Sequence, residues 1–356
     1  MEEAKRLEHE QLLRVLQFYP FEIGEVRLVS SRSGRTTWEI ETDQGTKVLK
    51  QAQMKPTRML FITGAHYHLM KNGLPITPIH TTNNGGLCIG AGKDLSYVLY
   101  DKVEGNEMTY YNKEQMEKAL AFAGQFHKAS AGYEPAENSK KRGRVGKWHK
   151  LFRWKLQELE GNKQIALSYP NDPFSLMFLE YVDKMLERGK NALKALDEPE
   201  YNQWSKETIE AKSFSQQDFT LARFTDVDGN AYMKELHSIT NDLPARDLRI
   251  ILNKVMKKLS VWDEELAIHL LGSYDSVNPL TEDQYKVLWI DLAFPHLFCS
   301  IIHKYYLGQK RSWSDEKYIW ALQNIIAVED SKDQFLKQFP EVVKEIKRRS
   351  GGKLSE

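Results

Sequence analysis

Two acidic residues stand on either side of a turn sequence in the second half of the chain. Asp218 precedes a short apolar run, and Glu235 closes the segment that follows the turn residues Asp228-Gly229-Asn230. Two brief strands joined by a glycine-containing turn form a hairpin, so we expect both carboxylates at the same end of it. Such a pair suits phosphoryl transfer, because one acid faces the attacking hydroxyl while the other binds the metal that bridges the phosphates.

A lysine at the end of a predicted strand offers the cation that such a site needs. Lys50 ends the segment KVLK and stands before a predicted helix at Arg58–Lys71, a position from which an ammonium would meet the phosphates of ATP. A lysine at a strand end is more often solvated surface. The helix RMLFITGAHYHLMK contains no acid, so the sequence leaves the partner of Lys50 unidentified. Its His66 and His68 point to different sides of the helix, which excludes joint chelation of a metal.

Short β-like segments separated by turn residues fill the N-terminal part of the chain. A first helix ending at Phe18 is expected, followed by strands at 26–29, 36–42, 47–50, 86–89 and 96–100. Beyond Gly105 helical spacing prevails, with helices expected at 116–129, 152–159, 174–196, 248–259, 264–274, 285–306, 316–328 and 335–347. The sequence therefore predicts an α+β chain with a strand-rich lobe and its linker at residues 1–104, and a helical lobe at residues 105–356.

The composition is that of a globular chain large enough for two lobes. It has 356 residues, 41% of them hydrophobic and 28% charged, with a formal net charge of +1. Near-neutral charge argues against nucleic acid as an obligatory partner. The N-terminus opens with acids and lacks the pattern of a signal peptide, and we expect no insertion into a membrane. Cys88 and Cys299 are more readily explained as reduced thiols inside a cell than as a disulfide.

Several short motifs occur in an order that is more specific than any one of them. They are KVLK (47–50), YVLYDKVEG (97–105), AFAGQFHKAS (121–130), QQDFTLARF (216–224) and NDLPARDLR (241–249). Together with ITGAHYHLMKNGLP and GKWHK, they extend the likeness over nearly the whole chain. By these motifs the chain resembles the bacterial spore coat protein S (CotS) family, within the aminoglycoside phosphotransferase and choline kinase group. The resemblance implies a protein-kinase-like fold, with a small antiparallel-sheet N-lobe and a larger helical C-lobe.

The resemblance also implies roles for particular residues. Asp218 takes the place of the catalytic base, and Lys50 that of the lysine on the ATP phosphates. The linker near Tyr100 and Lys102 lies where relatives hold the nucleotide. If the chain binds a nucleotide, the resemblance implies that Lys50 and the backbone of this linker hold it.

The catalytic loop departs from the pattern of working enzymes of this group. Where relatives carry a His-x-Asp opening and then an Asn, this chain has Gln216, Asp218 and Arg223. Arginine has no acceptor atom and a permanent positive charge, so it would repel magnesium there. Glu235 replaces the metal-binding Asp of the next strand, and His237 stands where a second Asp is common. The longer glutamate shifts its oxygen more than magnesium tolerates, because that ion requires near-octahedral ligands at about 2.1 Å.

Other parts of the pattern are kept or weakened. Asp242 and Asp247 match the family motif, and we expect them to brace the catalytic loop and to start a helix at Leu248. Gly34 is the one glycine in SSRSGRTT, so the turn that is glycine-rich in relatives has a single glycine here. Asp218 keeps two interpretations, a turn residue that caps local backbone groups or a catalytic base with a residual functional role.

These departures favour a pseudokinase used as a structural or assembly component. The resemblance implies incorporation into the endospore coat after synthesis in the mother-cell cytoplasm, with other spore coat proteins as partners. Two alternatives stay open. One is an active small-molecule phosphotransferase that uses Asp218, Lys50 and Glu235, with Arg223 in place of the second cation. The other is nucleotide binding without turnover, so ATP stays open as a cofactor, whereas magnesium is disfavoured and no metal site is assigned.

One irregular segment, Gly132–Lys150, is polar and basic. It fits a solvated surface insertion, which is the ordinary role of such a cluster, or a loop over the cleft that meets an anion.

Overall fold

The computed structural model describes residues 10–32 and 34–352. The start of the first expected helix and the last four residues of the chain lie outside these ranges. Contacts between residues divide the chain into two compact units. The first combines Met1–Met108, Ala129–Arg142 and Ala222–Thr240, and the second combines Thr109–Lys128, Gly143–Leu221 and Asn241–Glu356. The chain thus crosses between units several times, and the predicted acidic hairpin falls mostly in the first unit.

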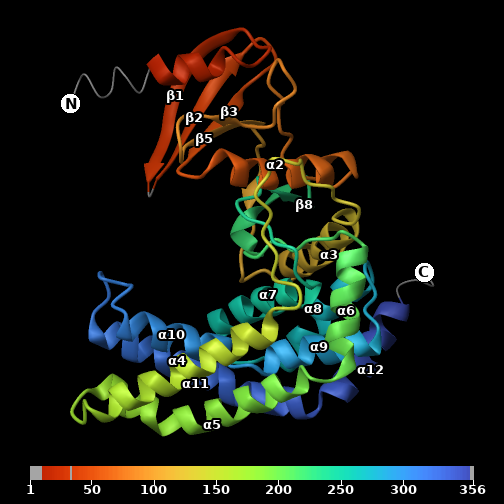
Figure 1. Ribbon diagram of the computed structural model, residues 1–356. Coiled ribbons are helices and arrows are strands. Elements are labelled where there is room, and N and C mark those ends of the chain that lie inside the picture. The colour runs from red at the N-terminus through yellow and green to blue at the C-terminus, as the bar shows by residue number, and fades with distance from the viewer. Residues whose placement is uncertain (1–9, 33, 353–356) are drawn as a thin grey trace. The chain divides into compact units, whose positions relative to one another are not determined.

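An antiparallel sheet forms the frame of the first unit. Its five strands within the described residues have the order β1 (Ile23–Arg32), β2 (Arg35–Thr42), β3 (Lys47–Ala52), β5 (Ser96–Asp101) and β4 (Ile89–Gly90), and Figure 1 shows β1, β2, β3 and β5 side by side. Residues 10–16 are helical and pack Leu12 and Leu16 on Trp38 and Leu49 of the sheet. The antiparallel sheet predicted from the turn signals is confirmed.

Helix α2 (Pro56–Lys71) follows β3 in the same unit. It begins at a proline and ends before Asn72, whose backbone amide bonds to the carbonyls of His68 and Met70. Proline suits the first helical turn because its missing amide would have no partner there. Met59 of this helix packs against Val98 and Tyr100 of β5, so α2 is tied to the strand that carries the predicted linker.

A second, three-stranded sheet completes the first unit. It consists of β6 (Asn106–Glu107), β7 (Phe224–Val227) and β8 (Asn230–Met233). The turn between β7 and β8 has Asp228 at φ 51° and Gly229 at φ 80°, the left-handed pair that a tight two-residue hairpin requires. Met233 exchanges backbone hydrogen bonds with Pro75 and Thr77, so the predicted hairpin exists and is anchored to the chain that follows α2.

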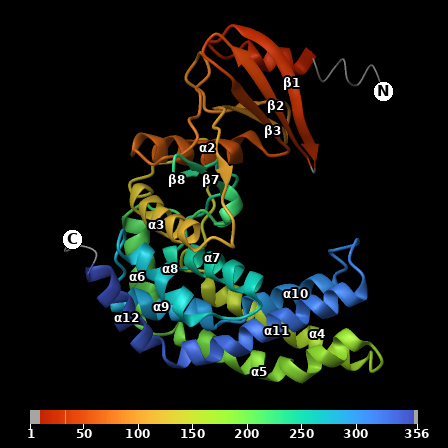
Figure 2. The same cartoon turned by 180° about the vertical axis from the view of Figure 1, so that it is seen from behind.

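Helices make up the second unit. They are α3 (Lys113–Ala129, whose last residue belongs to the first unit), α4 (Trp148–Leu167), α5 (Pro173–Ala195), α6 (Pro199–Glu210), α7 (Pro244–Leu259), α8 (Glu264–Asp275), α9 (Glu282–Ala293), α10 (His296–Tyr306), α11 (Asp315–Lys337) and α12 (Phe339–Gly352). Figures 1 and 2 both show α4, α5, α10 and α11 side by side. The short 3-10 turn η1 (Leu221–Arg223) leads into β7.

Several helix boundaries differ from those predicted. The sequence missed α6, placed the start of α4 at Phe152, and started α7 at Leu248 although the helix begins at Pro244. The expected helix at 285–306 is two helices, because Phe294 before Pro295 is extended (φ −66°, ψ 131°). A residue before proline avoids the helical conformation, which explains the break.

The segment Glu282–Tyr306 passes a length and composition test for a membrane span, contrary to expectation, but 78% of its most apolar window is buried within the structure. It is the one such segment among the described residues, and the break at Pro295 divides it into α9 and α10. A mostly buried core helix passes the same test. Cys88 and Cys299 are both free thiols, as expected; Cys299 is buried and Cys88 is partly buried.

Candidate functional site

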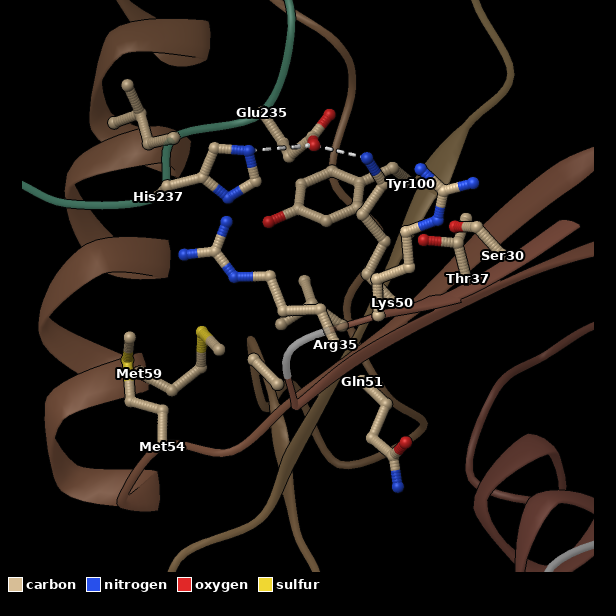
Figure 3. Close-up of a pocket in the computed structure, with 14 residues that line it drawn as sticks. Ser30, Arg35, Thr37, Lys50, Gln51, Met54, Met59, Tyr100, Glu235 and His237 are labelled. Atoms are coloured by element: carbon tan, nitrogen blue, oxygen red, sulfur yellow. Dashed lines mark hydrogen bonds and ion pairs between the residues drawn. The ribbon is translucent and has the colours of Figure 1, made fainter. Parts of the chain in front are cut away.

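A pocket of about 290 Å³ lies entirely within the first unit. Figure 3 shows its side chains converging from β1, β2, β3, β5, α2 and the segment after β8. Three of the six predicted site residues line it: Lys50, Tyr100 and Glu235. The tertiary structure therefore brings the predicted phosphate lysine and the second acid of the predicted pair into one cavity.

Lys50 and Glu235 form an ion pair in this pocket. The same carboxylate oxygen, Oε1, lies 3.2 Å from Nε2 of His237, and Figure 3 marks both interactions. The partner of Lys50 that the sequence left unidentified is therefore Glu235, the residue expected to replace the metal-binding Asp of relatives. The Glu235 side chain is 10% exposed, compared with 30% for Lys50.

Burial and charge act in opposite directions on Glu235. Burial opposes ionisation, but the hydrogen bond from His237 and the charge of Lys50 outweigh it, so the pKa of the Glu235 carboxyl lies well below its usual range. The pKa of the His237 imidazole is also lowered, in this case because burial outweighs the hydrogen bond and the negative charge of Glu235. The group is therefore a carboxylate held by an ammonium on one side and by an imidazole that stays neutral near pH 7 on the other.

Two arginines add positive charge around His237. Arg223 and Arg35 both lower the pKa of its imidazole by charge repulsion, and Figure 3 shows the Arg35 side chain directed toward it. Arg223 is partly buried, and its charge reaches the group that contains Glu235. The position where relatives carry a metal-binding Asn thus contributes a cation to this region.

His66 connects α2 to the same segment. Its Nε2 lies 2.6 Å from the carbonyl of Thr77, and its Nδ1 accepts from the amide of Leu236 at 3.4 Å. A carbonyl only accepts and an amide only donates, so this arrangement requires a neutral ring with its proton on Nε2. Burial lowers the pKa of His66 to about 4, which keeps the ring neutral. α2 therefore holds the backbone next to Glu235 through an uncharged histidine, in a helix without an acid.

The predicted nucleotide linker has amides that are already occupied. The amide of Asp101 donates to the carbonyl of Pro78 at 3.0 Å, and that of Lys102 donates to Thr46 at 3.2 Å. The Tyr100 side chain is buried in the pocket wall. Lys102 does not line the pocket, and its ammonium lies 3.4 Å from a Glu39 carboxylate oxygen. Neither amide can bond to a nucleotide base unless its present hydrogen bond to a backbone carbonyl is broken.

The predicted catalytic base lies in the second unit. Asp218 accepts from the ammonium of Lys254 at 2.7 Å, and its side chain is 46% exposed. The two residues just before Asp218 are held by Asp247, which accepts from the amides of Gln216 and Gln217 at 2.6 and 3.0 Å. Gln217 has φ 76°, a left-handed conformation that is uncommon for a residue with a side chain. Asp247 therefore supports a strained loop, as expected from the motif.

His127 supplies the third contact of Asp247. Its Nε2 lies 3.2 Å from the Asp247 carboxylate, and its Nδ1 lies 2.9 Å from the hydroxyl of Tyr274. Asp242, the other acid of the NDLPARDLR motif, accepts from the indole of Trp148 at 2.9 Å and from Arg246 at 3.1 Å. These contacts explain why both acids of the NDLPARDLR motif are buried.

Magnesium does not fit the first-unit pocket. Glu235 is its one lining carboxylate, while Arg32, Arg35 and Lys50 also line it. No group of three His, Cys, Asp or Glu side chains able to hold a metal occurs among the described residues. A divalent ion bound by oxygen ligands needs several carboxylates or carbonyls and is repelled by nearby cations. We therefore derive no reaction step through a metal at this site.

The sequence interpretation missed the contribution of β2 to the pocket. Thr37 pairs with Lys50 across the β2–β3 ladder, and Arg35 lies two residues away on the same face. Alternation along a strand places residues two apart on one side, so the pattern Arg35-x-Thr37 opposite Lys50 was a signal that could have been read. No comparable signal links His66 to Leu236, which is 170 residues away in the chain.

Solved structures define the class of this fold. An aminoglycoside phosphotransferase from Alicyclobacillus acidocaldarius aligns with a TM-score of 0.76 at 16% identity, covering 94% of this chain and 96% of that one. Amicoumacin kinase hAmiN aligns with a TM-score of 0.61 at 15% identity, covering 93% of this chain and 96% of that one. The chain therefore has the predicted two-lobed, kinase-like α+β fold. At these identities the likeness establishes the fold and not the activity.

The sequence comparisons identify the family. Residues 34–339 match the model of the family described as "Spore coat putative kinase YutH". Spore coat protein S of Bacillus subtilis (strain 168) is 64% identical over 342 residues, which cover 96% of this chain and 97% of that protein. The chain belongs to this family of spore coat proteins with a kinase-like fold, and the suspected resemblance to spore coat protein S is confirmed.

Proposed function

We propose that this chain is a structural or assembly component of the bacterial endospore coat that keeps a kinase-like fold without phosphoryl transfer. The observation that carries the proposal is the charge group around Glu235. Glu235 is bonded to Lys50 and His237, and the charges of Arg35 and Arg223 act on His237. Phosphoryl transfer depends on charge neutralisation by metal ions, so a site that repels them loses its largest contribution.

The location in the coat follows from the family. A protein 64% identical over nearly the full length of both chains is a spore coat protein, and we infer the same place for this chain after its synthesis in the mother cell. Its partners would then be other coat proteins. The test is to follow a fluorescent fusion during sporulation and to extract the coat of mature spores. A fusion that stays in the mother-cell cytoplasm and is absent from the coat extract would contradict this part of the proposal.

Nucleotide binding without turnover is the second candidate. It is favoured by the pocket of about 290 Å³, in which Arg32, Arg35 and Lys50 supply positive charge, and by the braced loop that carries Asp218. It is disfavoured by the occupied amides of Asp101 and Lys102. An active phosphotransferase would require in addition that a metal enter beside these cations.

Thermal unfolding with ATP separates the three functions. A ligand present well above its dissociation constant must raise the unfolding midpoint of a protein that it binds when folded. We expect no shift with ATP, either without or with magnesium. A shift that does not depend on magnesium would support binding without turnover. A magnesium-dependent shift accompanied by ADP release would overturn the pseudokinase proposal.

A reverse substitution tests the assignment of the metal position. The double variant R223N/E235D restores the residues that relatives carry there. We expect this variant to gain a magnesium-dependent stabilisation that the parent lacks, because a cation is removed and the carboxylate is shortened. In this variant Lys50 still faces a carboxylate, because E235D keeps the charge of its partner. If the double variant gains no magnesium affinity while its fold is intact, the position of the lost metal site is wrong.

A further inference from the structure

The basic segment singled out in the sequence forms a small pocket at the start of α4 in the second unit. This α4 pocket has a volume of about 320 Å³. Its apolar lining comes from Trp148, Leu151 and Trp154, and its cations are Arg144, Lys147 and Lys150. None of these residues belongs to the site described above, and no acidic residue lines the pocket.

Trp154 supplies an exposed aromatic wall. Its side chain is 52% exposed, whereas Trp148 at the floor is 1% exposed and donates its indole N–H to Asp242 at 2.9 Å. A large aromatic surface left in water is informative because tryptophan is most often buried or at an interface. The pocket therefore has a floor that is fixed by the core and a wall that still offers apolar area.

Positive charge surrounds that wall. The sequence from Arg144 to Gln157 contains no Asp or Glu. Among the described residues, Lys150 and Arg153 have no ion pair with a carboxylate, and the ammonium of Lys147 donates to the carbonyl of Gly143 at 2.8 Å. The α-helix adds to this charge, because its N-terminus is the positive end of its dipole. Cations at this end do not help the helix itself, so an anionic partner would relieve their repulsion.

Three carboxylates around the segment have identified partners. Asp197 lies 3.2 Å from Nε2 of His149, and Glu158, one turn beyond Trp154, is bonded to His303. Asp242 under the floor is held by Trp148 and Arg246. None of these three carboxylates pairs with Lys147 or Lys150.

The backbone that carries the pocket is held in place. The amides of Arg144 and Val145 both donate to the carbonyl of Asn241, at 2.8 and 3.1 Å. Gly146 has φ 72°, which favours glycine and lets the chain turn into α4. The amide of Trp148 donates to the hydroxyl of Tyr201 at 3.0 Å. A pocket fixed in this way loses little entropy when a partner binds.

We propose that the α4 pocket docks an acidic peptide segment of a partner protein, with one apolar side chain of that segment against Trp154 and its carboxylates over Lys147 and Lys150. The volume is at the lower limit of pockets that enclose small molecules, which suits a single side chain. An inorganic anion would leave the apolar wall unused. Nucleic acid fits less well, because the cations occupy about one helical turn and not a long stripe. This inference does not depend on whether the first-unit pocket binds nucleotide.

Fluorescence polarisation with the full chain tests the proposal. The probe is a short labelled peptide of Glu and Asp residues around one central Phe, and its companion has Gly in place of that Phe. We expect the Phe peptide to bind and the Gly peptide to bind at least tenfold more weakly. The variants W154A and K150E should each weaken binding of the Phe peptide by roughly tenfold or more, as expected for an aromatic anchor and its neighbouring charge.

Matched variants on the same unit serve as controls. Trp320 is 64% exposed on α11 and Lys344 is 73% exposed at its side chain on α12, so W320A and K344E change the same residue types elsewhere. They should leave peptide binding unchanged, and all four variants should keep the parent unfolding midpoint. Failure of the intact chain to bind the Phe peptide would overturn the proposal. Equal weakening by the control variants would do the same, as would inorganic polyphosphate that binds as tightly as the peptide and is unaffected by W154A.

Discussion

The two compact units each retain an acid of the predicted catalytic pair, but they hold it in opposite ways. In the first unit Glu235 is 10% exposed at its side chain and is bonded to Lys50 and His237. In the second unit Asp218 is 46% exposed and pairs with Lys254. Buried charges depend on their partners, whereas exposed ion pairs contribute little. Glu235 is therefore fixed by buried partners in the first unit, whereas Asp218 lies half exposed on a loop of the second unit that Asp247 holds.

The same contrast between a buried and an exposed acid holds for Asp247 and Asp218 within the second unit. Asp247 is buried and accepts hydrogen bonds from two backbone amides, so its role is to hold the loop. Asp218 is 46% exposed at its side chain and pairs with Lys254. The shape of this loop therefore rests on Asp247, whereas any chemistry at the loop would rest on the exposed Asp218.

The largest expected effect comes from removing the buried support of the loop. Asp247→Ala would leave the amides of Gln216 and Gln217 and the ring of His127 without their acceptor. Unsatisfied buried groups cost about 1–3 kcal/mol each, so we expect the free energy of unfolding to fall by about 4 kcal/mol, measured by denaturant titration. A loss of less than about 1 kcal/mol would show that the loop does not depend on this acid.

A second prediction concerns pH and His66. Burial lowers the pKa of this ring from 6.5 to about 4, so the unfolded chain takes up a proton at a higher pH than the folded chain. The stability contribution is complete above pH 6.5 and is lost as the pH falls toward 4, by about 3 kcal/mol in total. His66→Gln keeps a donor and an acceptor without titrating, so its unfolding free energy should fall less between pH 7 and pH 4 than that of the parent.

The control for this pH experiment is His269→Gln. The side chain of His269 is 35% exposed and lies beside Glu265 and Glu117. Exposed charged pairs contribute little to stability, so we expect this variant to change the slope less than His66→Gln does. An equal change of slope in both variants would mean that the effect does not come from the buried ring.

A third, smaller effect is expected at the ion pair of the first unit. Lys50→Met removes the cation and leaves Glu235 with His237 alone. Breaking a buried pair costs 3–5 kcal/mol, but Lys50 is 30% exposed, so we expect a loss of about 2 kcal/mol. In a double-mutant cycle with Glu235→Gln, the combined loss should be smaller than the sum of the single losses. The exposed pair Lys163–Asp183 is the matched control, and additive losses at Lys50 and Glu235 would contradict direct coupling.

The smallest effect is expected at the second acid of the comparison. Asp218→Ala breaks a half-exposed pair with Lys254 and should change the free energy of unfolding by about 0.5 kcal/mol or less. Denaturant titration against the Asp247→Ala variant gives the direct contrast within one loop. If Asp218→Ala costs as much as Asp247→Ala, the division between shape and chemistry in this loop does not hold.

Local sequence patterns predicted much of the fold. The turn Asp228-Gly229 predicted the β7–β8 hairpin, and Asn72-Gly73 predicted the end of α2. The boundaries failed where local signals compete, as at Pro295, where a continuous apolar pattern concealed a break between two helices. Alternation and turn residues act over a few positions, so they report elements better than the exact ends of those elements.

The candidate site was predicted in its residue types and not in its contacts. Lys50, Tyr100 and Glu235 were expected near a nucleotide and do share a pocket. The ion pair between Lys50 and Glu235 joins residues 185 positions apart, and no local pattern reports such a contact. Whether Asp218 acts as a base, and whether Arg223 excludes a metal, stay predictions until the variants above are measured.

The amino-acid order alone established that residue 223 is an arginine and that α2 carries no acid, because residue identity needs no structure to be read. Folding was required to select the partners: it placed the Glu235 carboxylate against Lys50 and His237 and buried His66 so deeply that its ring stays neutral. The physical reason is that charge strength and proton affinity depend on burial and on neighbours brought together from distant parts of the chain.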